Sequence, residues 1–211
     1  MISKILKESL FHNWDDLEKE IETLPTTKQR GDVFEDFVFA YFSLNRALYQ
    51  IDQIYKIDDV PTTIRKQYKL ERKDSGIDGI LVLEDGRVAA YQAKFRTNRK
   101  KPTYDELAKF WAEARHVDYH YTIANAYSLS KLCLKNKKHI GILVEEFERL
   151  DESFFKQLHE FANNKKPKRI FYKPDKFQDR MIKKVVRGFE NYDRGKMIAA
   201  CGTGKTLTAL W

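Results

Sequence analysis

Residues 74–94 read DSGIDGILVLEDGRVAAYQAK, and the arrangement of the rest of the chain follows from this stretch. Residues 79–84 form an apolar run, and residues 87–95 form a second one. Between them stands Asp85-Gly86, a two-residue pair typical of tight hairpin turns. The pattern predicts two antiparallel strands joined by this turn.

Polar side chains gather at one end of this predicted hairpin, where apolar packing does not require them. Asp78 stands at the start of the first strand. Gln92 and Lys94 are two residues apart on the second strand, so their side chains share a face. We therefore expect a carboxylate, an amide and an ammonium to lie close together.

Upstream of the hairpin, the sequence predicts helices and then a first strand. Residues 2–24 indicate one or two amphipathic helices, with Asn13 as an N-cap. Apolar residues recur at intervals of three and four over 28–45, which predicts a long helix, and Glu35 lies beside its apolar face. Residues 49–57 alternate weakly, as an early strand would. A short helix is weakly indicated after it, in TTIRKQYKL.

Downstream of the hairpin, helical and strand patterns alternate. Thr103 and Glu106 form a capping box for a helix that reaches about residue 115. The later expectations are a strand at 119–126, a helix at 128–135, a strand at 139–144 and a helix over 151–161 with Asp151 as its cap. Neighbouring early strands pair through the hairpin and later strands arrive by helical crossovers, so we expect an α/β fold with a mixed central sheet flanked by helices.

Charge and length narrow the class of protein. The 211 residues carry 39 Lys and Arg against 31 Asp and Glu, a net charge of +8. This balance favours a polyanionic partner, nucleic acid first, although a basic protein without such a partner stays an alternative. The length allows one domain of about 150 residues and a smaller remainder.

Cysteine use and hydropathy bear on the compartment. Cys133 and Cys201 have no partner at metal-ligand spacing, so we expect a reducing compartment, no disulfide framework and no structural zinc. The first residues are charged throughout, unlike a signal peptide, and no apolar run approaches the ~20 residues that span a bilayer. We expect a soluble cytoplasmic protein without a membrane partner.

A change in composition predicts two domains. Residues 163–176 are rich in Lys, Asn and Pro and are interpreted as a linker. Residues 1–162 would form the first domain, and 177–211 would begin a second, with a helix to about 189 and a short strand at 195–200.

The polar end of the hairpin suits phosphodiester hydrolysis. That reaction uses a divalent cation, and Mg²⁺ prefers oxygen ligands. Asp78, the Gln92 amide oxygen and the Ala93 backbone carbonyl are the candidate metal ligands, and Glu35 would complete the inner or outer shell. Lys94 would orient or deprotonate the attacking water and balance developing charge. The alternative is that these residues are only the solvated ends of a hairpin.

These residues resemble the PD-(D/E)xK nucleases of the restriction-endonuclease-like fold. Gly76-Ile77-Asp78-Gly79 is similar to the first motif of that family, and Gln92-Ala93-Lys94 to the second, in the Gln-x-Lys variant of the Mrr-like branch. Residues 31–35, GDVFE, look like that branch's helical motif. The resemblance implies Mg²⁺-dependent cleavage of double-stranded DNA by Glu35, Asp78, Gln92 and Lys94. Gln92 departs from the commoner acid, which implies altered metal ligation.

The last residues carry a phosphate-binding pattern. Residues 199–206, AACGTGKT, match a Walker A loop between a short strand and a helix. In this pattern backbone N–H groups cradle ATP phosphates, Lys205 reaches them and Thr206 takes Mg²⁺; the alternative is a Gly-rich turn. The candidate ATP-binding residues are Gln178, Gly202, Thr203, Gly204, Lys205 and Thr206.

Taken with Phe177-Gln178, this loop resembles the start of a RecA-like domain of a superfamily 2 helicase, whose Q motif reads adenine. A nuclease joined to such a helicase resembles the N-terminal part of single-polypeptide type I restriction-modification enzymes. The resemblance implies further helicase and methyltransferase domains, ATP hydrolysis only in the full-length protein, and it leaves open transient dimerisation for double-strand cleavage.

Residues 94–101 hold five Lys or Arg in eight positions, which indicates a DNA path beside the hairpin or merely a solvated loop. The leading hypothesis is a metal-dependent DNA endonuclease domain coupled to an ATP-driven motor. A catalytically degenerate DNA-binding module is the rival. A small-molecule ATPase would leave residues 1–160 unexplained.

Overall fold

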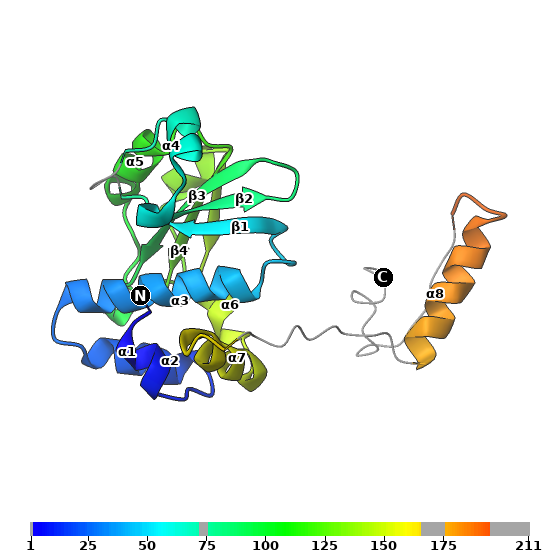
Figure 1. The fold of residues 1–211 in the computed structure, drawn as a ribbon, viewed down its shortest axis with the longest axis horizontal. Helices are drawn as coiled ribbons and strands as arrows, with labels where there is room; N and C mark the ends of the chain where they lie inside the picture. The colour runs from blue at the N-terminus through cyan, green and yellow to red at the C-terminus, as the bar shows by residue number, and fades with distance from the viewer. Residues whose placement is uncertain (1, 72–75, 166–175, 195–211) are drawn as a thin grey trace. The chain divides into compact units, whose positions relative to one another are not determined.

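A five-stranded mixed sheet lies at the centre of the first part of the chain (Figure 1). The computed structural model describes residues 2–71, 76–165 and 176–194. The chain divides into two units, residues 1–167 and residues 168–211. The predicted strand at 195–200 and the Walker A pattern lie outside the described residues.

The strands follow one another across the sheet in chain order: β1 (Ile51–Lys56), β2 (Gly79–Leu83), β3 (Val88–Lys94), β4 (Tyr119–Ala124) and β5 (His139–Ile142). β1, β2 and β3 pair antiparallel, whereas β4 and β5 are parallel to β3. The predicted hairpin is confirmed, and Gly86 supplies the turn with a φ of +83°. The mixed sheet follows because a tight turn joins β2 to β3 while longer crossovers join the later strands.

Helices cover both faces of this sheet (Figure 1). One layer contains α1 (Lys4–Glu8), α2 (Trp14–Thr23), α3 (Thr27–Leu44), α6 (Val144–Glu148) and α7 (Glu152–Ala162). The other contains α4 (Thr62–Tyr68) and α5 (Tyr104–Glu113). Side chains of β3 alternate between the two cores: Ala89 and Tyr91 join the first, and Val88 and Ala90 the second.

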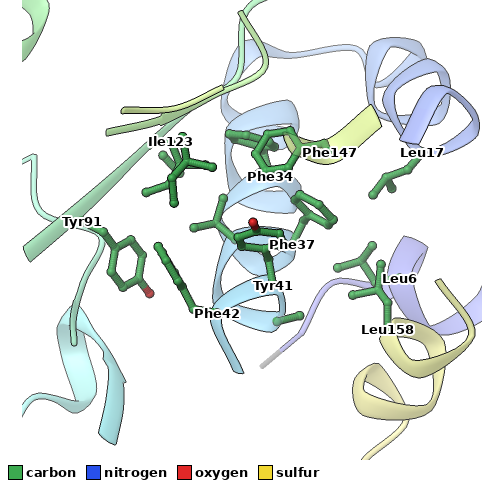
Figure 2. Close-up of a cluster of buried hydrophobic side chains, with 14 of the residues drawn as sticks. Leu6, Leu17, Phe34, Phe37, Tyr41, Phe42, Tyr91, Ile123, Phe147 and Leu158 are labelled. Carbon is green, nitrogen blue, oxygen red and sulfur yellow. The ribbon is translucent and has the colours of Figure 1, made fainter. Parts of the chain in front are cut away.

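Helix α3 carries the aromatic centre of the larger core (Figure 2). Phe37 packs edge-on against Phe147 of α6, with ring centroids 5.3 Å apart, and lies 5.1 Å from the ring of Trp14. Phe42 contacts Tyr91 of β3 at 5.4 Å. These contacts hold α3 against the sheet.

The helix caps read from the sequence are confirmed. Asn13 accepts the Asp16 N–H at 2.9 Å, and Asp151 accepts that of Phe154 at 2.9 Å. Thr103 and Glu106 form the expected capping box. A further capping box, Thr26 with Gln29, begins α3 and was not anticipated.

Two local predictions are wrong. The helix expected over 128–135 is only a 3₁₀ turn, Lys131–Lys135. The strand expected to reach residue 144 ends at Ile142, because α6 begins at Val144 with Glu145 and Glu146 in its first turn, where acids are favourable. In the second unit, helix α8 (Lys176–Phe189) agrees with the predicted helix. Among the residues described, no helix is long and apolar enough to cross a membrane.

Candidate active site

The hairpin register brings Asp78 next to the end of β3. Gly79 pairs with Tyr91, and the Asp78 N–H donates to the Tyr91 carbonyl at 2.9 Å. The Ala93 N–H in turn donates to Asp78 Oδ2 at 2.6 Å. The predicted neighbours Asp78, Gln92, Ala93 and Lys94 therefore lie together, at the start of β2 and the end of β3.

Gly79 makes this close arrangement sterically possible. A Cβ atom at this position would overlap the Tyr91 side chain and the Tyr55 carbonyl. Tyr91 is 1% exposed, and the charges of Asp78 and Glu35 add to burial in raising its pKa. No local pattern predicts that a glycine is required here, because the atoms that exclude a Cβ belong to β1 and β3.

Asp78 is an unusual carboxylate. It keeps a partly exposed surface but is densely surrounded by protein, and this desolvation is the main cause that raises its pKa to about 7. The charge of Glu35 raises the pKa further, whereas the Ala93 N–H and Lys94 lower it. The two carboxyl groups, one just before β2 and the other on α3, thus lie near enough to repel each other.

Burial favours the neutral forms of Glu35 and Lys94, as it does for Asp78. Burial, followed by the charges of Asp32 and Asp36, raises the pKa of Glu35, and Lys56 and Lys94 oppose this. Burial lowers the pKa of Lys94, against the charge of Asp78. An added cation would stabilise the ionised forms of the two carboxyl groups, an effect that Lys94 supplies only in part.

Gln92 has a side-chain acceptor that finds no partner within residues 2–71, 76–165 and 176–194. Its Nε2 donates to the Gly76 carbonyl at 2.5 Å, and because that carbonyl only accepts, the orientation of the amide is settled. The Oε1 atom is buried and makes no hydrogen bond to any residue that the structure describes. Gly76, with a φ of +68°, adopts a conformation that favours glycine. A buried acceptor of this kind needs a donor, a water molecule or a cation.

The oxygen donors suit Mg²⁺, which prefers hard ligands. Among the described residues, no group of three or more His, Cys, Asp or Glu side chains could hold a metal ion. A metal here would thus depend on two carboxylates together with the Gln92 amide and the Ala93 carbonyl, and this donor set fits a hard cation.

The basic loop after β3 differs from the expectation of a free phosphate-binding stretch. Arg96 pairs with Glu106 at 2.5 Å. Arg99 pairs with Glu18 and Glu148, each at 2.5 Å, and also contacts Asp15 at 3.2 Å. These acids come from α2, α5 and α6. Two of the five basic residues are therefore engaged inside the fold, while Lys100 and Lys101 are exposed.

Of the candidate ATP-binding residues, one lies within the part of the chain that the structure describes. Gln178 lies on α8, and Gly202 to Thr206 fall outside the residues that the structure describes. Their proposed role rests on the sequence pattern alone.

Comparison with solved structures finds two similar proteins. The "ATP-dependent Type ISP restriction-modification enzyme LlaBIII bound to DNA" matches with a TM-score of 0.67 and 22% identity, over 95% of this chain and 12% of that one. The "MspJI Restriction Endonuclease in Complex with 27-mer Oligonucleotide" has a TM-score of 0.35 and 11% identity, over 69% of this chain and 35% of that one.

No protein-family model and no curated protein matches the chain. The chain spans about an eighth of the LlaBIII structure, 12% of its length. At 22% identity the likeness concerns the fold. The expected fold class is confirmed: a mixed α/β sheet flanked by helices, shared with a restriction-modification enzyme.

Proposed function

We propose that residues 1–167 are a metal-dependent endonuclease domain that hydrolyses phosphodiester bonds in double-stranded DNA. The observation that carries the proposal is the meeting of Asp78 and Glu35 beside Lys94, with the pKa of both carboxyls raised. Such perturbed pairs are typical of reactive sites. The fold shared with LlaBIII supports the same interpretation.

Asp78, the Gln92 amide oxygen and the Ala93 carbonyl would hold Mg²⁺, with Glu35 in its inner or outer shell. When bound, the metal would polarise the phosphate and increase the acidity of a water molecule. The unpaired Gln92 Oε1 and the two poorly compensated carboxyls both support a cation at this position.

The remaining groups have separate tasks. The Ala93 N–H holds Asp78 at 2.6 Å, and the Gly76 carbonyl holds the Gln92 amide so that its oxygen is available. Burial lowers the pKa of Lys94, so a larger fraction of its side chain is the neutral amine, which can accept a proton from the attacking water, than at an exposed lysine. Once protonated, it would offset negative charge on the phosphate.

A wider role as part of an ATP-dependent restriction system follows from the sequence pattern at 199–206. DNA cutting would be coupled, in the full-length protein, to a helicase-type motor that binds ATP through Lys205 and Thr206. The LlaBIII structure is named as an ATP-dependent restriction-modification enzyme, which supports this context. We place the protein in the cytoplasm, with methyltransferase domains and transient dimerisation as further parts of the proposal.

A second candidate is a DNA-binding module that has lost catalysis. It is favoured by Gln92 in place of an acid and by the lack, among the described residues, of three metal-ligating His, Cys, Asp or Glu side chains in one group. Such a module would bind DNA and never cut it.

The test is cleavage of supercoiled plasmid by the full-length protein with Mg²⁺ and ATP. Asp78→Ala and Lys94→Ala should each lower nicking by a factor on the order of 10² or more while DNA binding in a gel-shift assay persists. Lys109→Ala, at an exposed lysine on α5, is the control and should cut normally. Full cutting by both site variants would refute the nuclease site, and DNA binding without cutting by the unaltered protein would favour the second candidate.

A further inference from the structure

An ion pair joins the helix that carries Glu35 to the strand end beside Asp78. Lys56 is the last residue of β1, where it pairs with Gly79. The next residue, Ile57, donates its N–H to the Asp78 carbonyl at 3.0 Å. The Lys56 ammonium forms an ion pair with Asp36, the residue that follows Glu35 on α3.

Every polar atom of the Asp36 carboxylate is used. Asp36 is 7% exposed. Oδ1 accepts from Lys56, and Oδ2 accepts the Ser3 N–H at 2.6 Å. The Lys56 Nζ also lies 5.4 Å from the ring centroid of Phe39, one turn further along the same helix. α3 thus encloses the ammonium on two sides.

Stability alone gives no strong reason for this pair. Removing two charges from water is costly, and buried ion pairs can often be replaced by apolar residues without loss of stability. In this pair the Asp36 carboxylate is buried and the Lys56 side chain is partly exposed. The pair favours one relative placement of the two elements that carry it, because other placements would leave the buried carboxylate without its counterion. Here the two elements are α3, which bears Glu35, and the end of β1, which is bonded to Asp78.

We propose that Lys56 and Asp36 are positioning residues of the metal site, holding α3 against the end of β1 so that Glu35 and Asp78 meet the same cation. This inference rests on the proposed nuclease function. It assigns no direct contact with DNA or with the metal to either residue.

The test measures Mn²⁺ binding by isothermal titration calorimetry in the absence of DNA, followed by the Mg²⁺ dependence of plasmid nicking. Lys56→Met should weaken Mn²⁺ binding by about tenfold, as loss of an outer support of a metal ligand does. It should raise the Mg²⁺ concentration needed for half-maximal nicking while leaving DNA affinity unchanged. Lys56→Arg should restore most of the Mn²⁺ affinity.

The double variant Asp36→Leu with Lys56→Met replaces the ion pair by an apolar pair. It distinguishes a role of the ion pair in stabilising the fold from its role in positioning the metal site. We expect the double variant to regain melting temperature relative to Lys56→Met but not Mn²⁺ affinity. Recovery of both would show that the pair only stabilises the fold. Lys4→Met, which removes the exposed pair Lys4–Glu8 on α1, is the matched control and should bind Mn²⁺ normally.

The two proposals fail in different ways. If Asp78→Ala binds Mn²⁺ as the unaltered protein does, the metal site itself is wrong. If Asp78→Ala loses Mn²⁺ binding but Lys56→Met keeps it, only the positioning role is overturned. Lys56→Gln carries the same test should the methionine variant not fold, because it removes the charge and keeps a polar side chain.

Discussion

The Gln92→Glu variant tests why an amide, and not a carboxylate, occupies this position. In the glutamate variant the bond from Nε2 to the Gly76 carbonyl is lost, and two acceptors face each other. Leaving a buried acceptor unpaired costs about 1–3 kcal/mol. The new carboxylate also joins Asp78 and Glu35, whose pKa values are already raised. Without metal, we expect the variant to be about 2–4 kcal/mol less stable at pH 8.

The assay is thermal unfolding of the chain with EDTA and with saturating Mg²⁺. For a chain of this size, a loss of that magnitude lowers the melting temperature by about 5–10 °C. Mg²⁺ should raise the melting temperature of Gln92→Glu by more than that of the unaltered chain, because a charged ligand binds the cation more strongly than an amide and ligand binding stabilises the folded state.

Gln92→Met separates the two effects. It removes the hydrogen bond to Gly76 without adding a charge, so it should lose stability but show a smaller response to Mg²⁺ than the unaltered chain. An unchanged melting temperature of Gln92→Glu in EDTA would refute the reasoning about the buried amide. An equal response to Mg²⁺ in all three proteins would refute the assignment of Gln92 as a metal ligand.

Three further changes test other parts of the structure. Asp78 holds a proton to about pH 7 when folded, against 3.8 as the reference value, so the stability from that proton is lost as pH rises through 7. Without metal, the free energy of unfolding of Asp78→Asn, measured in urea, should therefore exceed that of the unaltered chain by about 1–3 kcal/mol at pH 8 and should equal it below pH ~4. The figure at pH 8 is reduced to allow for the partial exposure of Asp78. Arg99→Ala removes the ion-pair partner of the buried Glu18 and should lower the free energy of unfolding by about 2–4 kcal/mol in the same assay. No measurable loss would contradict this expectation. Gly79→Ala forces a Cβ into Tyr91 and should cost about 3 kcal/mol or prevent folding, so a normal melting temperature would show that the strands can separate there.

Much of the fold was open to prediction because its signals are local. The turn at Asp85-Gly86 and two apolar runs suffice for a hairpin, and hairpin pairing places Asp78 beside Gln92. The caps at Asn13, Thr103 and Asp151 lie within three residues of the N–H groups they accept. The weakly indicated helix after β1 forms as α4, whereas the helix predicted at 128–135 is only a 3₁₀ turn.

What the sequence by itself determined, then, is the hairpin, the mixed sheet and the polar residues at one end of that hairpin, because strand periodicity and turn chemistry act between near neighbours. Tertiary structure alone decided that Arg99 binds Glu18, 81 positions earlier, and that Lys56 binds Asp36. It also left Gln92 Oε1 without a hydrogen-bond partner in the part of the chain that the structure describes. These outcomes depend on how helices pack against the sheet, and packing joins residues whose separation along the chain carries no local pattern.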